Sequence, residues 1–159
     1  MDTSKKSFIE QLKKFSNGMF TTKNSDGRLH TRPMVIVKVD KDCKITLISD
    51  QDDAKVKELE KDGHVAFSGQ DDVGCYLTLS GTAKLKQDSS QVKDLWRSEF
   101  DAWFPEGPEK ALLIEIEPQE GECWDISGES RVKYAYELIK AKICDDKAEA
   151  EKYRDEASL

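Results

Sequence analysis

The segment ISDQDDAKV, residues 48–56, joins an expected strand to an expected helix and contains residue types that bind ions. A lysine beside a helix N-terminus is a common phosphate site, because the lysine and the unpaired backbone N–H groups are both positive. Here Lys55 follows Asp50, Asp52 and Asp53, and carboxylates repel phosphate. The segment is therefore a capped helix start, a cation-binding loop, or an altered phosphate site.

The cation-binding loop has the least support of these interpretations. Counted from Asp50, a calcium loop of the helix–loop–helix type needs an oxygen ligand at its fifth position, a glycine at its sixth and a glutamate at its twelfth. The sequence has Ala54, Lys55 and Lys61 at these positions. Capping by the aspartates and phosphate binding by Lys55 are compatible with each other, so both stay open.

A second candidate for ligand binding is the run Thr31-Arg32-Pro33-Met34, which leads into an apolar strand. The planar guanidinium of Arg32 can pair with phosphate, and Pro33 lacks an N–H, which leaves nearby backbone groups available to a ligand. Alone the run is a weak signal, because Arg-Pro at a strand edge is also ordinary surface chemistry.

Missing motifs argue against a serine nucleophile and against the usual glycine-rich nucleotide-binding loops. The sequence contains no G-x-S-x-G, no G-x-G-x-x-G and no G-x-x-x-x-G-K. Its four cysteines, Cys43, Cys75, Cys123 and Cys144, are widely spaced, and it has only two histidines. A metal site or a disulfide framework is therefore not expected.

Composition limits the partners. The chain of 159 residues has 25 Lys and Arg against 32 Asp and Glu, a net charge of -7. Nucleic acid and anionic membranes need a basic surface, so neither is expected as a partner. No apolar segment has the length of a signal peptide or a membrane span, and we expect a cytoplasmic protein.

Hydrophobic periodicity predicts where helices and strands lie. Alternating or apolar runs predict strands at 19–24, 28–40, 44–49, 64–70, 75–87 and 111–118, with 121–127 extending or pairing with the last one. Helical spacing predicts helices at 4–16, 52–62, 92–103 and from Ser130 onward. The tail 145–159 is almost wholly polar and is expected to be a solvated or fraying helix end.

These elements predict a barrel. Short turns separate the first three strands, whereas parallel neighbours would need a long crossover between them. We therefore expect a mainly β (α+β) fold, a six-stranded antiparallel β-barrel with peripheral helices. Residues 1–144, with an N-terminal and a C-terminal helix, would form this single domain.

Three longer motifs, in this order along the chain, carry a family resemblance. They are D-G-x-x-x-x-R-P-M at 26–34, A-W-F-P-E-G-P at 102–108 and E-x-W-D at 122–125. From Phe8 to Asp125 the chain resembles the general stress protein branch of the pyridoxamine 5'-phosphate oxidase-like flavin-binding split barrels. The resemblance implies a six-stranded split barrel that forms a homodimer with flavin mononucleotide (FMN) at the subunit interface. FAD is left open as the cofactor.

The resemblance also assigns residues to the cofactor site: Arg32, Met34, Val35, Ser49, Lys55, Tyr76 and Trp124. It implies that Ser49 and Lys55 hold the phosphate, and that Arg32 and the backbone of Met34 and Val35 lie along the flavin. These types suit the task, because lysine and arginine neutralise phosphate and serine donates a hydrogen bond.

The remaining two residues are assigned to the flavin ring. The resemblance implies that Tyr76 lies near the ring and that Trp124 approaches it from the partner subunit. Tryptophan offers a flat amphipathic surface for a flat ring, although core packing explains Trp124 equally well.

The implied function is that of a flavin-binding, stress-related protein, a flavin-dependent oxidoreductase that uses reduced nicotinamide or reduced flavin. Pyridoxamine phosphate oxidation is not favoured, because only Arg131 echoes the substrate signature of that oxidase. The alternative is a non-catalytic flavin-binding or ligand-sensing protein with weakened or lost cofactor binding. Asp50 and Asp53 motivate it, since one carboxylate about 6 Å from a phosphate charge costs roughly 3 kcal/mol at an effective dielectric of about 20.

Overall fold

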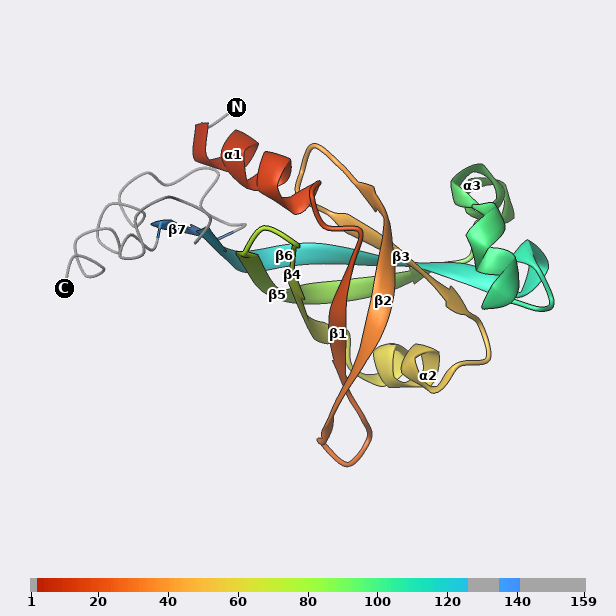
Figure 1. The fold of residues 1–159 in the computed structure, drawn as a ribbon. Coiled ribbons are helices and arrows are strands. Elements are labelled where there is room, and N and C mark those ends of the chain that lie inside the picture. The colour runs from red at the N-terminus through yellow and green to blue at the C-terminus, as the bar shows by residue number, and fades with distance from the viewer. Residues whose placement is uncertain (1–2, 126–134, 141–159) are drawn as a thin grey trace.

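Antiparallel strands form a closed barrel in the computed structural model, which describes residues 3–125 and 135–140. The barrel strands are β1 (Asn17–Lys23), β2 (Leu29–Val39), β3 (Ile45–Asp50), β4 (His64–Gln70), β5 (Cys75–Lys86) and β6 (Ala111–Asp125). They pair in the order β3-β2-β1-β4-β5-β6, and β3 also pairs with β6, so the sheet closes on itself (Figure 1). The predicted six-stranded antiparallel barrel is confirmed.

The alternation of side chains places apolar residues inside the barrel. In β5, Cys75, Leu77 and Leu79 are buried, whereas Tyr76 and Thr78 between them point to the other face. Full burial of one large apolar side chain stabilises a fold by about 1.5–3 kcal/mol. Burial of the apolar side chains on one face is therefore the physical reason why the alternating segments form strands. The largest fully buried side chains are those of Phe8, Phe20, Phe67, Leu12, Ile45, Leu47, Leu77, Leu79, Leu112, Leu113, Ile114 and Ile116.

Helices cover parts of the barrel. They are α1 (Thr3–Leu12), α2 (Ala54–Lys61), α3 (Ser89–Leu95) and the 3-10 helices η1 (Ser98–Ala102) and η2 (Pro108–Lys110). The helix α1 adds Phe8, Ile9 and Leu12 to the core, and α2 lies beside the β1–β2 hairpin (Figure 1). No helix among the described residues is long and apolar enough to cross a membrane.

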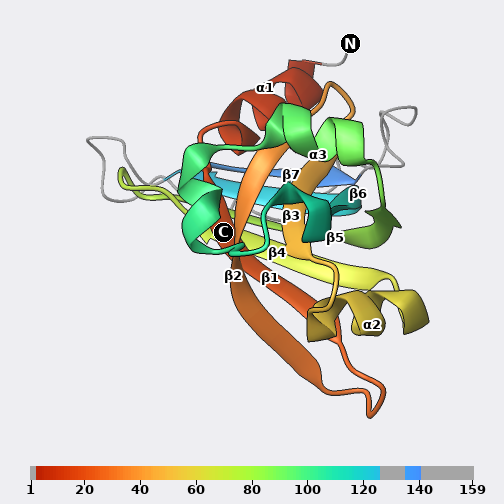
Figure 2. The ribbon, with the colours of Figure 1, turned by 90° about the vertical axis from the view of Figure 1, so that its right-hand side faces the viewer.

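A second apolar cluster lies outside the barrel, beneath α3. Val92 of α3 and Phe100 of η1 pack with Ile48 of β3 and Leu113 of β6. Figure 2 shows α3 in front of β3, where this cluster lies. The cluster includes Ile48, the residue before Ser49 of the predicted phosphate site.

The predicted helix at 92–103 is wrong in its middle. Trp96 (φ −65°, ψ 138°) and Arg97 (φ −124°, ψ 147°) are extended and separate α3 from η1. The bend lets the indole Nε1 of Trp96 donate to Asp101 Oδ1 at 2.9 Å. It also places the ring centroids of Trp96 and Phe100 5.7 Å apart. Tertiary aromatic packing thus overrides the helical spacing.

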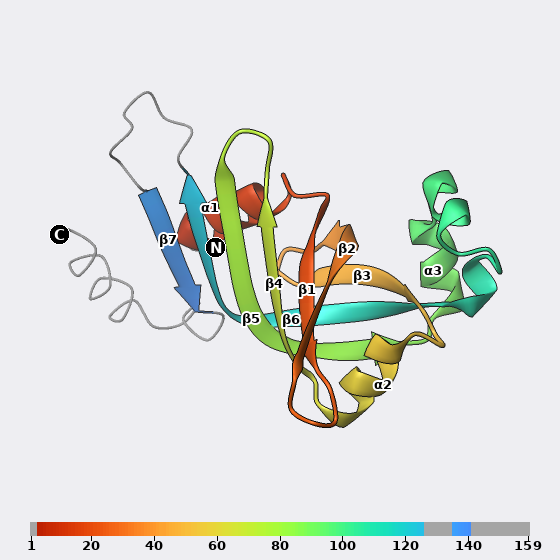
Figure 3. The ribbon, with the colours of Figure 1, turned by 60° about the horizontal axis from the view of Figure 1, so that its bottom comes forward.

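The predicted helix from Ser130 is also wrong, at least over Ala135–Lys140, which form the strand β7. This strand pairs with the distal half of β6, from Glu120 to Asp125, at the end of the sheet away from α3 (Figure 3). The reason is an available edge: β3 pairs with β6 only from Ala111 to Ile116, so the later half of β6 has room for a second partner. The other residues of the predicted helix and the tail 145–159 lie outside the described residues.

The long strand β6 is continuous, so the segment at 121–125 extends the predicted sixth strand. Its pairing with β5 shifts register between Ser80 and Gly81. A Cβ at Gly81 would lie 2.1 Å from the Glu117 carbonyl oxygen, so only glycine allows this close approach. Such an irregularity increases local twist and helps the strands to close into a barrel.

Candidate functional site

The junction between β3 and α2 brings two of the predicted residues together. Lys55, in the first turn of α2, is only 6% exposed, and its Nζ donates to the Ser49 hydroxyl oxygen at 3.2 Å. Ser49 is the penultimate residue of β3 and its hydroxyl donates to the Asp50 carbonyl at 3.1 Å. A buried ammonium and a hydroxyl therefore meet at the start of a helix; their binding of a phosphate stays a prediction.

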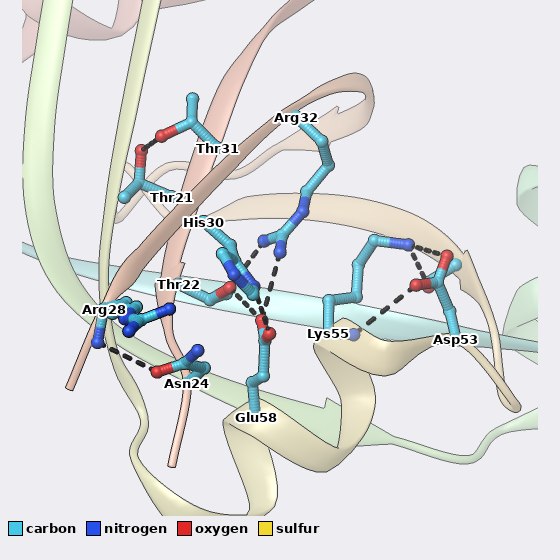
Figure 4. A network of polar contacts seen from close by, with 11 residues as sticks. Thr21, Thr22, Asn24, Arg28, His30, Thr31, Arg32, Asp53, Lys55 and Glu58 are labelled. Atoms are coloured by element: carbon cyan, nitrogen blue, oxygen red, sulfur yellow. Dashed lines mark hydrogen bonds and ion pairs between the residues drawn. The ribbon is translucent and has the colours of Figure 1, made fainter. Parts of the chain in front are cut away.

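Asp53 is the aspartate that faces Lys55. It is the N-cap of α2, where one carboxylate oxygen accepts from the Lys55 backbone N–H and the other pairs with Lys55 Nζ (Figure 4). Burial raises the pKa of the Asp53 carboxyl, but hydrogen bonds from Lys55 and the charges of Lys55 and Arg32 outweigh burial, so the pKa lies below its ordinary value. Asp53 is consequently ionised at neutral pH and competes with any anion for Lys55.

The two other aspartates of the loop have different partners. Asp50 Oδ1 accepts from the backbone N–H of Asp52 at 2.8 Å, which tightens the turn. Asp52 Oδ2 lies 3.2 Å from Nζ of Lys110, the last residue of η2. The acidic loop therefore presents one carboxylate to Lys55 and uses the others to shape and anchor the turn.

A buried carboxylate, Glu58, lies one helical turn after Lys55. Arg32 Nη2 donates to Glu58 Oε2 at 3.0 Å, and the Thr22 hydroxyl donates to the same oxygen at 2.5 Å. His30 Nδ1 lies 2.6 Å from Glu58 Oε1, and Arg32 Nη1 donates to the Thr22 oxygen at 2.5 Å (Figure 4). Four side chains from β1, β2 and α2 thus form one polar network beside the Lys55–Asp53 pair.

Charge in this network is balanced. Burial raises the pKa of the Glu58 carboxyl, but hydrogen bonds from Thr22, His30 and Arg32 and the charge of Arg32 outweigh burial and lower it overall. Arg32 and Lys55 therefore each have an ionised carboxylate partner. The local positive charge that a phosphate needs appears only when one of these carboxylates turns away.

Thr22, His30 and Glu58 were not among the residues predicted from the sequence. One usable signal was the spacing of three residues between Lys55 and Glu58, which places both on one face of a helix. Another was the hairpin, because a tight turn at 24–27 pairs Thr22 with His30. Glu58 was not expected in a buried site, because a glutamate in a helix with many charged residues is normally exposed.

Met34 and Val35 lie where β2 and β3 separate. The β2–β3 ladder begins at Ile36, which pairs with Leu47, so both residues lie beyond its end while they still pair with β1. Ser49 lies past the corresponding end on β3. Met34 and Val35 of β2 and Ser49 of β3 therefore lie past the same end of the β2–β3 ladder, where the two strands no longer pair.

Tyr76 and Trp124 lie opposite each other on β5 and β6, and Tyr76 is 39% exposed. Along β6, Trp124 lies twelve residues beyond Leu112, the partner of Ser49, which corresponds to about 40 Å of strand. One chain therefore does not bring this aromatic pair to Lys55. The approach of Trp124 from a partner subunit stays a prediction, and Tyr76 does not join the Lys55 site within its own chain.

A separate pocket of about 250 Å³ lies between the end of α1, the end of β2 and Arg97. It contains none of the predicted site residues. Its lining combines apolar residues with cationic ones: Phe15, Ile36, Val37 and Val39, and Lys13, Lys14, Lys38 and Arg97.

Comparisons with known proteins identify similar sequences and folds. The sequence model of a family described as pyridoxamine 5'-phosphate oxidase like matches residues 3–149. A putative general stress protein 26 from Jannaschia sp. CCS1 is 27% identical, with a TM-score of 0.61 over 76% of each chain. No match was found among curated proteins.

Two further solved structures share the fold at lower identity. A protein from Clostridium acetobutylicum, related to general stress protein 26 of Bacillus subtilis, is 19% identical, with a TM-score of 0.68 over 88% of this chain and 96% of that chain. A pyridoxamine 5'-phosphate oxidase-related, FMN binding protein from Nostoc punctiforme is 12% identical, with a TM-score of 0.60 over 88% of this chain and 98% of that chain.

Proposed function

Because the chain belongs to the pyridoxamine 5'-phosphate oxidase-like family, we propose that it binds FMN and acts as a flavin-dependent oxidoreductase. The observation that carries the proposal is the buried Lys55 ammonium, 3.2 Å from the Ser49 hydroxyl at the start of α2. A charged donor, a neutral donor and a helix start at one point suit a phosphate monoester.

The residues of the site fit the phosphate once Asp53 moves. The side chain of Asp53 is 42% exposed, so its carboxylate can turn into water and release Lys55. Glu58 is only 9% exposed and accepts from Thr22 and Arg32, so it keeps the Arg32 guanidinium oriented beside the site. Lys55 and Ser49 would bind the phosphate, and Arg32, whose charge Glu58 balances, would lie along the flavin.

The isoalloxazine ring would lie where the β2–β3 ladder ends. The backbone of Met34 and Val35 lies past this end, and backbone groups that point away from β1 there are available to a ligand. When bound, the flavin supplies the hydride and electron transfer. The protein's part is to bind the phosphate, orient the ring and exclude water from one side of it.

A homodimer with the flavin at the subunit interface is part of the proposal. On the outer face of the barrel, a run of exposed or half-buried residues from four strands carries no charge, although 36% of the chain is charged. Neighbouring strands supply these residues in register: Met19, Thr21, Thr31, Pro33, Ala66, Ser68, Tyr76 and Thr78. An uncharged face of this kind suits burial against a second copy, whose Trp124 would complete the site.

Titration of FMN against the purified protein tests the proposal. We expect a yellow protein, or quenching of flavin fluorescence on addition of FMN, with much weaker quenching of riboflavin because it lacks the phosphate. Reduced nicotinamide should then be oxidised faster than by the same concentration of free FMN. A colourless protein that leaves FMN fluorescence unchanged would contradict FMN binding.

The Lys55–Asp53 pair favours a second function, a ligand-sensing protein with weak flavin binding and no turnover. In that role Asp53 would act as an internal competitor, released only at a high flavin concentration. Flavin binding without oxidation of reduced nicotinamide above the free-flavin rate would favour this second function over the first.

Asp53→Ser is expected to raise FMN affinity by up to about tenfold, because the internal competitor for Lys55 is removed while serine can still cap α2. The gain is smaller than the full Coulomb repulsion because Asp53 is partly exposed and screened by salt. Fluorescence titration measures it. Asp52→Ser is the matched control, since it removes the same charge from the same loop at a side chain that pairs with Lys110. Equal affinities in all three proteins would show that Asp53 does not compete with the phosphate.

A further inference from the structure

Two buried cysteines are in direct contact at the end of the barrel away from α2. Cys75 begins β5 and Cys123 lies near the end of β6; their exposed fractions are 1% and 7%. The ladder pairs Cys75 with Asp125 and Cys123 with Leu77, so the cysteines are diagonal neighbours on adjacent strands. Their sulfur atoms are 3.2 Å apart.

We propose that Cys75 and Cys123 form a redox modification site, a dithiol that a hydroperoxide converts into a disulfide. Packing alone would be satisfied by any small apolar residue, whereas two thiols in contact can also exchange electrons with an oxidant. Because the partner sulfur is already at van der Waals contact, the second step of the oxidation is intramolecular and fast.

The chemistry needs one equivalent of hydrogen peroxide. The first thiol, as its thiolate, attacks a peroxide oxygen; the O–O bond breaks, and sulfenic acid and water form. The second thiol then attacks the sulfenic sulfur, the S–S bond forms, and the hydroxyl leaves as a second water. Two thiols lose two electrons and two protons in total, and the peroxide gains both.

Access to the pair runs past α1. Gln11 of this helix lies over Cys75, with its Oε1 3.9 Å from the Cys75 sulfur, and the Phe8 ring packs against the backbone of Gly121. Phe8, Ile9 and Leu12 hold α1 in the core, so peroxide reaches the thiols only when the end of this helix moves locally. We therefore expect oxidation that is slower than that of an exposed thiol and faster than global unfolding.

Disulfide formation would draw the ends of β5 and β6 together. The two sulfur atoms must approach each other by about 1 Å to form the bond. The two Cα atoms must also be less than about 7 Å apart, which is near the shortest Cα–Cα distance of diagonal neighbours on adjacent strands. Tyr76 and Trp124 lie on the other face of the same strands, directly after the two cysteines in sequence. The oxidation state of the dithiol would therefore change the position of the aromatic pair that the family resemblance assigns to the flavin ring.

Peroxide treatment of the reduced full-length protein, without flavin, tests this site. We expect an intact mass lower by two hydrogen atoms, no covalent dimer, and a cross-linked peptide that joins Cys75 to Cys123 after alkylation in denaturant. Reduction by dithiothreitol should restore the original mass. Because flavin is absent, a negative result would contradict this redox site without contradicting the proposed function.

Cysteine variants make the assignment specific. Cys43→Ser should form the same cross-link as the parent, because Cys43 is buried elsewhere in the core. Cys75→Ser and Cys123→Ser should each abolish it and leave the remaining thiol as a sulfenic or sulfinic acid. The proposal is overturned if the parent protein keeps both thiols alkylatable, or if the cross-link joins either of them to Cys43 or Cys144.

Discussion

Replacing Lys55 with alanine is expected to lower FMN affinity about a hundredfold. Hydrogen bonds to a charged group contribute about 1.5–3 kcal/mol, and each 1.4 kcal/mol is about tenfold in affinity. We expect the upper end of this range because Lys55 is buried, and a charge-assisted hydrogen bond is stronger where water is excluded. Titration of FMN fluorescence against parent and variant measures the loss.

The matched control is Lys57→Ala, which removes the same charge from an exposed position on the same helix. Its FMN affinity should equal that of the parent protein. Riboflavin, which has no phosphate, should bind Lys55→Ala and the parent about equally, and urea unfolding should show that both proteins are folded. Unchanged FMN affinity in Lys55→Ala would remove Lys55 from the site and with it the basis of the proposed function.

The strands and the contact between Ser49 and Lys55 were predictable because their signals are local. The alternation of apolar and polar residues in CYLTLSGTAKLK identifies β5 without knowledge of any other strand. Likewise the apolar positions Val56 and Leu59 and the capping Asp53 define α2, and a helix that starts four residues after β3 must bring Lys55 back to Ser49. Such features depend only on neighbours in sequence.

Two segments were predicted wrongly from the sequence, because residues distant in sequence decide their structure. Residues 92–103 have helical spacing, but the indole of Trp96 packs better against Phe100 and Phe104 once the chain is extended at Trp96 and Arg97. The segment Ala135–Lys140 has apolar residues that suit a helix or a strand, and the free distal edge of β6 selects the strand. Neither partner can be identified from the segment itself.

The role of the three aspartates also depends on distant contacts. In sequence, Asp52 and Asp53 are equivalent acidic neighbours of Lys55. The closing of β3 against β6 brings Lys110 to the loop, and Lys110 pairs with Asp52. Only Asp53 is then left to pair with Lys55, so the barrel closure determines which carboxylate neutralises the Lys55 ammonium.

Replacing Glu58 with alanine is expected to lower the free energy of unfolding by about 3 kcal/mol. The variant leaves Arg32 and Thr22 in a largely buried site without their acceptor, and breaking a buried ion pair from one side costs about 3–5 kcal/mol. The lower value is expected because Arg32 is 23% exposed and can partly regain water. Urea unfolding at neutral pH measures the change; Glu60→Ala, an exposed position on the same helix, should change stability little.

The pH dependence separates loss of charge from loss of packing. The pKa of Glu58 in the folded protein lies below its ordinary value of 4.5, so the folded state binds fewer protons there than the unfolded chain. The stabilisation from this carboxylate is complete above that value and is lost as the pH falls through 4.5 toward the folded-state pKa. Glu58→Gln keeps the shape without the charge, and should lose less stability than the parent between about pH 6 and pH 3. Parallel losses in both proteins would mean that Glu58 is not held ionised by Arg32, and that the network is neutral packing.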